Sequence, residues 1–296
     1  MKFVAVLAAA GIVTGAARMQ QPQFKAGVDV VRVDVSVTDH GKPVRNLTGA
    51  NFVVTDNGTS EPVASVTLER LPLRVVLVLD TSASVEGSAM ATLLDASRGL
   101  VGALKPTDRI AVLAVSDDVK LVTGFDAARS AALDTLARVR AGGSTSLYDA
   151  LQVAFELVQL DEAGGGARPL IIVCTDGLDT ASWLSGDDAV QAARRADVVV
   201  HVIDPSGSPA YGLAKHIDTV AQVSGGHTWP ATSERDLKEL FTATLTEMRD
   251  RYLLTFSPQT PAREGWHDLK VTLKNAHGDV LARPGYYVAN NGKGHG

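Results

Sequence analysis

Between residues 73 and 250, short apolar runs alternate with longer amphipathic stretches, and this alternation restricts the fold more than any other feature of the chain. The short runs are apolar almost throughout, which is typical of strands buried on both faces: RVVLVLD (74–80), RIAVLAV (109–115), LIIVC (170–174) and VVVHVID (198–204). The longer stretches have helical periodicity or composition: 90–104, 128–141, 146–160, 187–197, 211–226 and 233–250. Strands that alternate with helices form a mostly parallel sheet covered on both faces, so we predict a doubly wound α/β domain over residues 73–250.

Both flanks of this domain have the pattern of β-structure. Residues 27–72 alternate apolar and polar side chains from Val31 onward, and Asp56-Asn57-Gly58 is a hairpin signal. Alternation returns over 251–290. The first strand of the α/β domain enters at the amino edge of its sheet and the last helix leaves there. We therefore expect the two flanks to pack together as one small sandwich-like unit into which the α/β domain is inserted, followed by a disordered tail at 291–296.

The N-terminus has the pattern of a secretory signal peptide over residues 1–17. Lys2 precedes an apolar run at 3–13, and Gly15-Ala16-Ala17 supplies small residues before a cleavage point. The run is shorter than the ~20 residues that a membrane-spanning helix needs. We therefore predict an exported protein, periplasmic or secreted to the cell surface, with no membrane span after cleavage. An uncleaved anchor or a buried helix is the alternative.

Composition excludes some classes of partner and site. The formal net charge is −5, so no basic stripe is available to neutralise the phosphates of a nucleic acid. Aromatic residues make up only 5% of the chain, which disfavours base stacking and a carbohydrate-binding platform. The single cysteine, Cys174, cannot form an internal disulfide. It ends an apolar run, so we expect a buried thiol rather than a catalytic or metal-binding thiolate.

Small oxygen-bearing side chains follow two of the predicted strands, and another lies in a predicted loop. Asp80, Ser82 and Ser84 come after the strand at 74–80, Asp176 follows the strand at 170–174, and Thr145 lies in the loop GGSTS before a helix. In parallel sheets of this kind, ligand sites form beyond the carboxyl ends of the strands. Carboxylates and hydroxyls are hard oxygen ligands that suit Mg²⁺. These five residues therefore predict a magnesium site, although Mn²⁺ or Ca²⁺ would accept the same ligands.

The order and spacing of these residues resemble the metal-ion-dependent adhesion site (MIDAS) of the von Willebrand factor type A (VWA) domain. Asp80-Thr81-Ser82-Ala83-Ser84 matches the family pattern Asp-x-Ser-x-Ser, although Ala83 stands where Gly is usual. Thr145 and Asp176 match the second and third elements. The flanking stretches VTDHGKPVRNLTGANFVVTDNG (37–58) and LARPGYYV (281–288) resemble a bacterial group of exported VWA-related proteins.

The resemblance implies a Rossmann-like fold and a function in metal-dependent protein binding of the adhesion type. It implies that Ser82, Ser84 and Thr145 ligate the metal directly, and that Asp80 or Asp176 acts partly through water. Two carboxylates balance the charge of a divalent ion, and an open coordination position favours an Asp or Glu side chain presented by a partner protein. Leu178 departs from the family, in which an acidic residue is frequent at that position.

Three further residues are candidates for contact with such a partner. Trp183 and Leu184 follow the last predicted ligand, and they are either core residues or anchors for a partner, because aromatic groups dominate binding hot spots. Glu86 is either a solvated surface charge or a group at the rim of the site. The oligomeric state cannot be inferred from the sequence.

Other functions leave weaker traces in the sequence. Asp80, Ser82 and Ser84 alone would also suit the capping of a helix. A non-catalytic envelope module, in which a metal only stabilises loops, would need the same five residues. A Mg²⁺-dependent hydrolase is disfavoured because the chain has no nucleophile elbow, no phosphate-binding Gly-Lys-Ser/Thr loop and no His-Glu-x-x-His motif.

Overall fold

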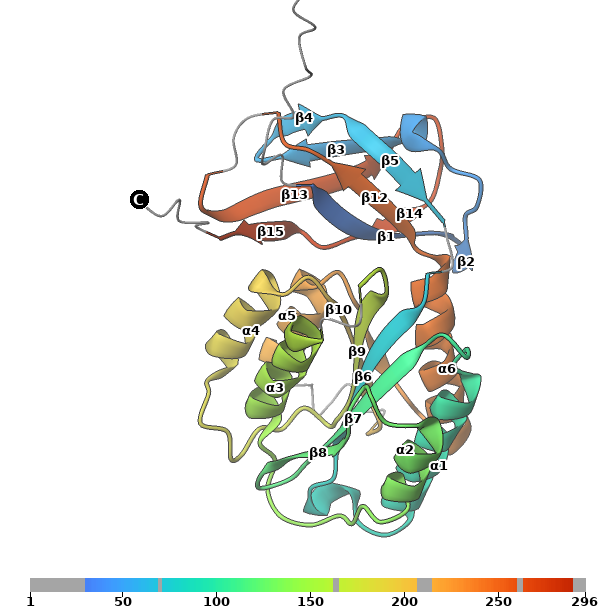
Figure 1. The fold of residues 1–296 in the computed structure, drawn as a ribbon, viewed down its shortest axis with the longest axis vertical. Helices are drawn as coiled ribbons and strands as arrows, with labels where there is room; N and C mark the ends of the chain where they lie inside the picture. The colour runs from blue at the N-terminus through green and yellow to red at the C-terminus, as the bar shows by residue number, and fades with distance from the viewer. Residues whose placement is uncertain (1–29, 69–70, 162–164, 207–214, 260–262, 290–296) are drawn as a thin grey trace, which may run out of the picture.

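The computed structural model describes residues 30–68, 71–161, 165–206, 215–259 and 263–289. The expected signal segment at 1–17 and the expected tail at 291–296 lie outside these ranges. The described chain forms an α/β unit with a smaller all-β unit stacked on one end of it (Figure 1).

A six-stranded sheet forms the centre of the α/β unit. Its strands are β6 (Leu73–Asp80), β7 (Arg109–Val115), β8 (Val119–Thr123), β9 (Arg168–Cys174), β10 (Val199–Asp204) and β11 (Thr228–Pro230). The order across the sheet is β11-β10-β9-β6-β7-β8. Neighbouring strands are parallel from β11 to β7, whereas β8 pairs antiparallel with β7 at the edge. The sheet is therefore mixed.

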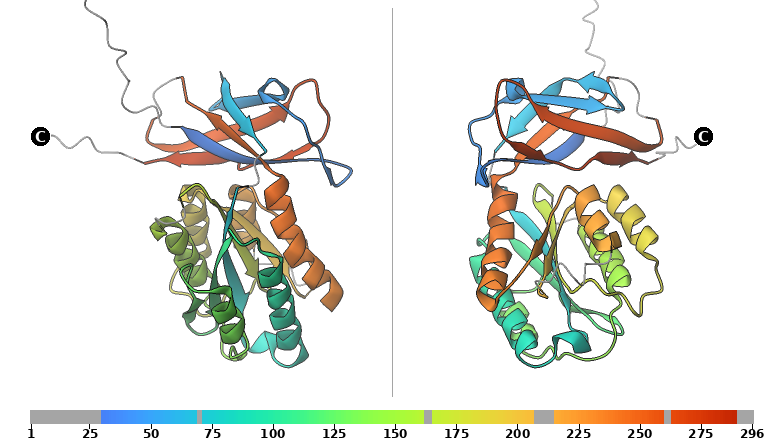
Figure 2. Two further views of the ribbon diagram at one scale, coloured as in Figure 1. Left: turned by 45° about the vertical axis from the view of Figure 1, so that its right-hand side comes forward. Right: turned by 180° about the vertical axis from the view of Figure 1, so that it is seen from behind.

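Helices cover both faces of this sheet (Figure 2). They are α1 (Ser88–Ala103), α2 (Arg129–Leu136), α3 (Leu147–Leu160), α4 (Gly186–Arg195), α5 (Lys215–Val223) and α6 (Glu234–Asp250). Alternate residues of β6 point to opposite faces: Val75, Leu77 and Leu79 pack with α1, α2 and α6, while Val76 and Val78 pack with α3, α4 and α5. Each face has its own apolar core, which explains why β6 is apolar throughout.

The β unit combines strands from both ends of the chain. The N-terminal flank gives β1 (Val31–Asp39), β2 (Lys42–Pro43), β3 (Phe52–Asp56), β4 (Thr59–Glu61) and β5 (Val63–Thr67). The C-terminal flank gives β12 (Tyr252–Phe256), β13 (Gly265–Leu273), β14 (Asp279–Leu281) and β15 (Gly285–Val288). One sheet has the order β14-β1-β12-β5 and the other β15-β13-β3-β4, so N-terminal and C-terminal strands are hydrogen-bonded neighbours in both. A third apolar core lies among these strands.

The turn at Asn57-Gly58 has the backbone that its sequence predicts. Both residues have positive φ, 46° for Asn57 and 81° for Gly58, and they join β3 to β4. Positive φ at both central positions is the geometry of a two-residue hairpin whose twist matches that of its strands.

The predicted helix over 128–141 is partly wrong. Helix α2 ends at Leu136, and Val139 and Ala141 pack against the core from non-helical backbone. The helical periodicity predicted correctly that these side chains are buried, but it predicted the wrong backbone conformation.

The two ends of the strands in this sheet have different surroundings, and we call them its amino edge and its carboxyl edge. Strand β6 starts beside the β unit and runs away from it, and α6 returns to the β unit, where Arg251 alone separates it from β12 (Figure 1). The carboxyl edge, formed by the carboxyl ends of β6, β9 and β10, therefore lies far from the β unit. Every helix among the described residues is too short or too polar to span a lipid bilayer.

Candidate functional site

The two predicted acidic ligands lie at the carboxyl ends of neighbouring parallel strands. Asp80 is the last residue of β6, and Asp176 follows β9. Asp80 is buried, and both of its oxygens are held: Oδ1 accepts from the backbone N–H of Ser82 at 3.0 Å, and Oδ2 accepts from the Thr175 hydroxyl at 2.8 Å. The Asp80 carboxylate is thus fixed in one orientation by the chain itself.

The two predicted serine ligands lie side by side just beyond β6. Ser82 precedes a short 3₁₀ turn over Ala83–Val85, and this turn brings the Ser84 hydroxyl to 3.0 Å from the Ser82 hydroxyl. Neighbouring ligands at about 2.1 Å from an octahedral Mg²⁺ lie about 3.0 Å apart, so this pair has the separation that two adjacent ligands need. Ser82 is buried, whereas Ser84 is exposed at the surface.

Backbone contacts join the loop that carries Thr145 to both of the other segments. On one side, Gly142 N donates to Thr81 O at 2.8 Å, and Ala83 N donates to Gly143 O at 3.0 Å. On the other side, the Thr145 N–H donates to the Thr180 hydroxyl at 2.9 Å. The three segments that hold the predicted ligands therefore form one connected group of loops at the carboxyl edge.

Gly143 in this loop adopts a backbone conformation and a close contact that suit glycine but not a residue with a side chain. Its φ is +83°, and a Cβ atom there would lie 2.5 Å from the carboxylate of Asp117. Asp117 follows β7, and its Oδ1 accepts from the Ser144 N–H at 2.7 Å. The glycine therefore permits the approach of the acidic side chain that holds the loop next to Thr145.

The electrostatics of the site fit a divalent cation. Burial raises the pKa of the Asp80 carboxyl, hydrogen bonds from Ser82 and Thr175 oppose this shift, and the nearby Asp176 charge adds to it. Within the described part of the chain, no Lys, Arg or His forms an ion pair with either acid. Two neighbouring carboxylates without a protein cation, beside paired hydroxyls, form a donor set that suits Mg²⁺.

The Cys174 thiol lies beneath this site. Cys174 is buried, and burial together with the Asp80 charge raises the pKa of its thiol far above the usual range. Among the described residues, no three His, Cys, Asp or Glu side chains come together as a metal-binding group. A metal at this edge would therefore depend on the serine and threonine hydroxyls.

Sequence reasoning missed the residues that anchor the loop after Asp176. Asp179 Oδ2 accepts from the backbone N–H of Leu147 at 2.8 Å and of Tyr148 at 3.1 Å, so it caps the start of α3. In return, Asp149 in the first turn of α3 accepts from the N–H groups of Trp183 and Leu184, each at 3.0 Å. The acidic first turn was visible in the sequence, but its partner lies more than 30 residues away along the chain.

The three predicted partner-contact residues lie in different environments. The Trp183 side chain is 99% exposed although its backbone is anchored to α3. Leu184 is half-buried and packs against the core under α3 and α4. Glu86 is exposed next to the 3₁₀ turn. In the loop after Asp176, Leu178 is 56% exposed and is a second exposed apolar side chain beside Trp183.

A groove of about 410 Å³ opens directly from the predicted ligands. Asp80, Ser84 and Asp176 line one end of it, and helix α1 and the start of α6 form its sides. The groove gives the candidate site an approach from solvent.

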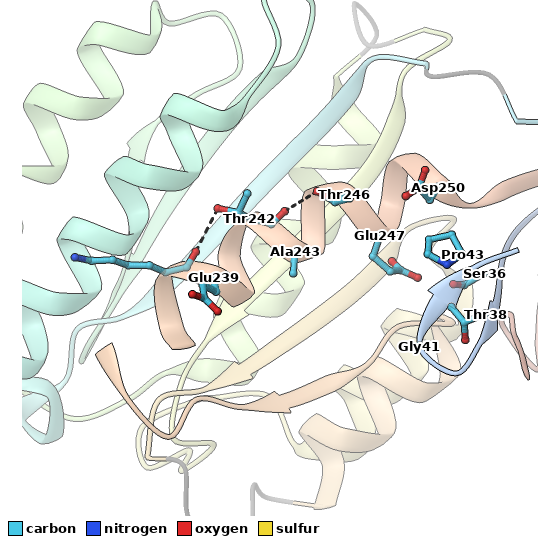
Figure 3. Close-up of a pocket in the computed structure, with 11 residues that line it drawn as sticks. Ser36, Thr38, Gly41, Pro43, Glu239, Thr242, Ala243, Thr246, Glu247 and Asp250 are labelled. Carbon is cyan, nitrogen blue, oxygen red and sulfur yellow. Dashed lines mark hydrogen bonds between the residues drawn. The ribbon is translucent and has the colours of Figure 1, made fainter. Parts of the chain in front are cut away.

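A second cavity, of about 670 Å³, lies between α6 and the β1–β2 hairpin (Figure 3). Thr242, Ala243 and Thr246 line it from the helix, and Ser36 and Thr38 line it from β1. None of the predicted metal ligands borders it, so its size alone does not make it the functional site.

Comparison with known proteins identifies the type of domain. A family model for the von Willebrand factor type A domain matches residues 75–243. This segment runs from β6 into α6 and includes all five predicted ligands.

Individual relatives are distant. An uncharacterized protein of Synechocystis sp. is 33% identical over 113 residues, which cover 36% of this chain and 26% of that protein. The matched segment therefore spans about a quarter of that relative.

Among solved structures, a von Willebrand factor type A protein from Catenulispora acidiphila superposes with a TM-score of 0.52 and 14% identity, covering 89% of this chain and 74% of that chain. Proximal thread matrix protein 1 from the mussel byssus, with a zinc-occupied MIDAS motif, gives a TM-score of 0.50 at 16% identity over 67% of this chain and 50% of that one. At such identities the superpositions establish the fold.

Proposed function

This chain belongs to the von Willebrand factor type A domain family, and we propose that it is a metal-dependent protein-binding module whose metal ion engages an acidic side chain of a partner. Domains of this family generally mediate metal-dependent protein binding and are mainly non-catalytic. The observation that carries the proposal is the junction of three loops at the carboxyl edge, where two carboxylates and a pair of hydroxyls 3.0 Å apart have no cation of the protein as counter-charge among the described residues.

The five side chains have distinct proposed roles. Ser82, Ser84 and Thr145 would hold the ion directly, while Asp80 or Asp176 would act partly through water. Mg²⁺ is the proposed ion, and the zinc-occupied MIDAS of the mussel protein is a precedent for another divalent ion in this fold. A bound divalent ion would supply the positive charge that attracts a partner's Asp or Glu.

Neighbouring exposed residues would complete the binding surface. Trp183 is the proposed apolar anchor, because an exposed aromatic side chain on a fixed backbone loses little conformational freedom on binding. Glu86 lies on the rim, where it would disfavour partners with additional negative charge. Leu184 packs inward, so its proposed role is to support the loop rather than to touch a partner.

The remaining parts of the proposal concern the organisation of the chain. We propose that residues 73–250 form the binding domain and that the flanks at 27–72 and 251–290 form its support, a division supported by the pairing of β1 with β12 and of β3 with β13. The basic and apolar N-terminal segment supports export to the periplasm or cell surface.

A pull-down from an envelope extract tests the proposed function. The immobilised chain should retain a protein in Mg²⁺ and release it in EDTA, and Asp176→Ala should weaken the interaction with that purified protein by roughly 100-fold, the scale of the loss when a metal site is damaged. Trp183→Ala should weaken it by roughly tenfold, since hot-spot truncations cost about 1–2 kcal/mol or more.

Asp187→Ala is the matched control, because this acid lies in the first turn of α4 with a side chain 91% exposed and should leave binding unchanged. Binding that persists undiminished in EDTA would contradict the proposal. A Mg²⁺-dependent rise in melting temperature without any Mg²⁺-dependent binding would instead indicate a structural module.

A further inference from the structure

The groove that opens from the metal ligands differs in character along its length. Asp80, Ser84 and Asp176 line its metal end, and we call the remainder the α1–α6 groove. Five residues that line it also belong to the apolar core beneath α1 and α6, and we call them its floor: Val85, Leu93, Cys174, Ala231 and Leu237. The groove therefore brings the margin of this apolar core next to the metal end.

The other residues that line the α1–α6 groove, which we call its rim, are mostly polar and uncharged. They include Ser88 and Thr92 of α1, Ser206 after β10, and Thr232 and Ser233 before α6. Beyond the metal end, Glu234 is the one charged side chain among the described residues that line the groove.

We propose that the α1–α6 groove receives one aliphatic side chain, Val, Leu or Ile, adjacent in the partner to the acidic side chain at the metal. This inference rests on the proposed function and adds to it the sequence preference of the partner: an acid next to an aliphatic residue, rather than an acid alone.

The chemistry of the groove favours an aliphatic side chain over a charged one. The core residues that line the groove carry no charged side chain to pair with a buried amine or carboxylate, and burying an unpaired charge is costly. A second acid in the groove would also lie near the Glu234 carboxylate. A volume of about 410 Å³ is at the lower end of the range for ligand pockets, which suits one side chain and its backbone rather than a large ligand.

A peptide library tests this preference. Phage that display peptides with one fixed Glu and randomised neighbours are bound to the immobilised chain in Mg²⁺ and eluted with EDTA. We expect enrichment of Val, Leu and Ile at one position next to the Glu. A synthetic Glu-Leu peptide should bind about tenfold or more tightly than its Glu-Ala counterpart, the usual discrimination of an apolar pocket between side chains that differ by several methyl or methylene groups.

A matched pair of variants locates the preference. Ala89 and Ala91 are both exposed on α1, but only Ala89 lines the groove. Ala89→Trp should abolish the difference between the Glu-Leu and Glu-Ala peptides, whereas Ala91→Trp should preserve it, and both should keep the Mg²⁺-induced rise in melting temperature. Thr92→Phe provides a second blocked variant if Ala89→Trp does not fold.

A spectroscopic readout is independent of affinity. With ¹³C-labelled leucine methyl groups, the Glu-Leu peptide should shift the resonances of Leu93 and Leu237, and the Glu-Ala peptide should not. EDTA-eluted peptides without an aliphatic preference, or a preference unchanged by Ala89→Trp, would overturn the inference while leaving the proposed function intact. The absence of any EDTA-releasable binding would overturn both.

Discussion

The amino and carboxyl edges of the six-stranded sheet differ in whether their charged side chains are paired within the protein. At the amino edge, buried arginines are paired within the chain: Arg168 with Asp34, Arg283 with Asp197 at 3.2 Å, and Arg251 with Glu247 at 2.8 Å. At the carboxyl edge, Asp80 and Asp176 lie near each other without a cation of the protein as partner among the described residues. The amino edge is therefore stabilised by ion pairs within the chain, and the unpaired acids of the carboxyl edge support the proposal that this edge binds an external cation.

The arginines of the amino edge also connect the two units of the molecule. Arg168 opens β9 and pairs with Asp34 of β1, and it donates to the carbonyl of Arg251, the residue between α6 and β12, at 3.2 Å. Arg283 of the C-terminal flank reaches Asp197, just before β10. Charge at this edge is therefore used to hold the β unit against the α/β unit.

The largest expected effect is on the amino edge. Arg251 is fully buried, and its guanidinium donates to Glu247 and to the carbonyl of Gly225 at 2.7 Å. Arg251→Met should lower the free energy of unfolding by about 3 kcal/mol, because it breaks the ion pair of a fully buried guanidinium and leaves the half-buried Glu247 carboxylate without its main counter-charge. Urea denaturation monitored by circular dichroism measures this change.

Arg45→Met is the control for that experiment. Arg45 pairs with Asp250 at 3.0 Å, but its side chain is 54% exposed, so the loss should stay below about 1 kcal/mol. Equal losses in the two variants would mean that burial does not distinguish the ion pairs of this edge.

The next effect is expected at the carboxyl edge, where the free energy of unfolding should depend on an added ion rather than on an ion pair within the chain. At a Mg²⁺ concentration of about 100 times its Kd, the free energy of unfolding should rise by about 2.7 kcal/mol. Asp176→Asn should abolish this gain. In EDTA it should change stability by less than about 1 kcal/mol, because it also removes the repulsion between Asp176 and Asp80.

Differential scanning calorimetry with and without Mg²⁺ measures this difference. Asp187→Asn, an exposed acid on α4, should respond to Mg²⁺ like the wild type. A wild-type protein whose unfolding is indifferent to Mg²⁺, Mn²⁺ and Ca²⁺ would remove the distinction between the two edges.

Much of the α/β unit could be predicted because strand and helix periods differ clearly in long segments. The antiparallel direction of β8 was also accessible, since three residues, Ser116–Asp118, join it to β7 and a parallel crossover needs a dozen or more. The end of α2 was not accessible. Residues 137–141 place their apolar side chains in the core without being helical, and the periodicity of so short a segment cannot separate the two conformations.

The candidate site also contains residues that the sequence could predict and residues that it could not. The spacing of Asp80, Ser82 and Ser84 is local, so sequence alone could predict their common location. The residues that hold the loops, Asp117 and Asp179, act on backbone 27 and 32 residues away. Such contacts depend on how the strands are ordered in the sheet, which local patterns do not specify.

A smaller effect is expected at the loop anchor of the carboxyl edge. Asp179→Ala should lower the free energy of unfolding by about 1–2 kcal/mol, because it removes the cap of α3. It should also increase amide hydrogen exchange at residues 178–184, since Ser182 donates both its N–H and its hydroxyl to Asp179. Asp126→Ala, at a side chain 95% exposed, should change neither quantity appreciably. Unaltered exchange in Asp179→Ala would show that the loop does not depend on this contact.

The smallest effect is a pH dependence that belongs to the interior of the α/β unit near the amino edge. His201 is fully buried in β10, where Nδ1 accepts from the backbone N–H of His227 at 3.1 Å and Nε2 faces the Glu247 carboxylate at 3.0 Å. Burial lowers the pKa of His201, and the Glu247 charge opposes that shift. A proton on Nδ1 would displace the hydrogen bond from His227, so the folded state favours the neutral ring.

The sign of the pH effect follows from this lowered pKa. As pH falls below about 6.5, the unfolded chain binds a proton that the folded chain does not, so the free energy of unfolding decreases, by at most about 1.4 kcal/mol per pH unit for one group. The pKa of Glu247 is also lowered, but its contribution is lost only below its ordinary value of 4.5. Urea denaturation between pH 7.5 and 5.5 therefore separates the histidine from the glutamate. His201→Gln should flatten the decrease, leaving a smaller slope from His227, whose pKa burial also lowers. His40→Gln, at a side chain 95% exposed, should keep the full slope, and an identical slope in all three proteins would exclude His201 as its source.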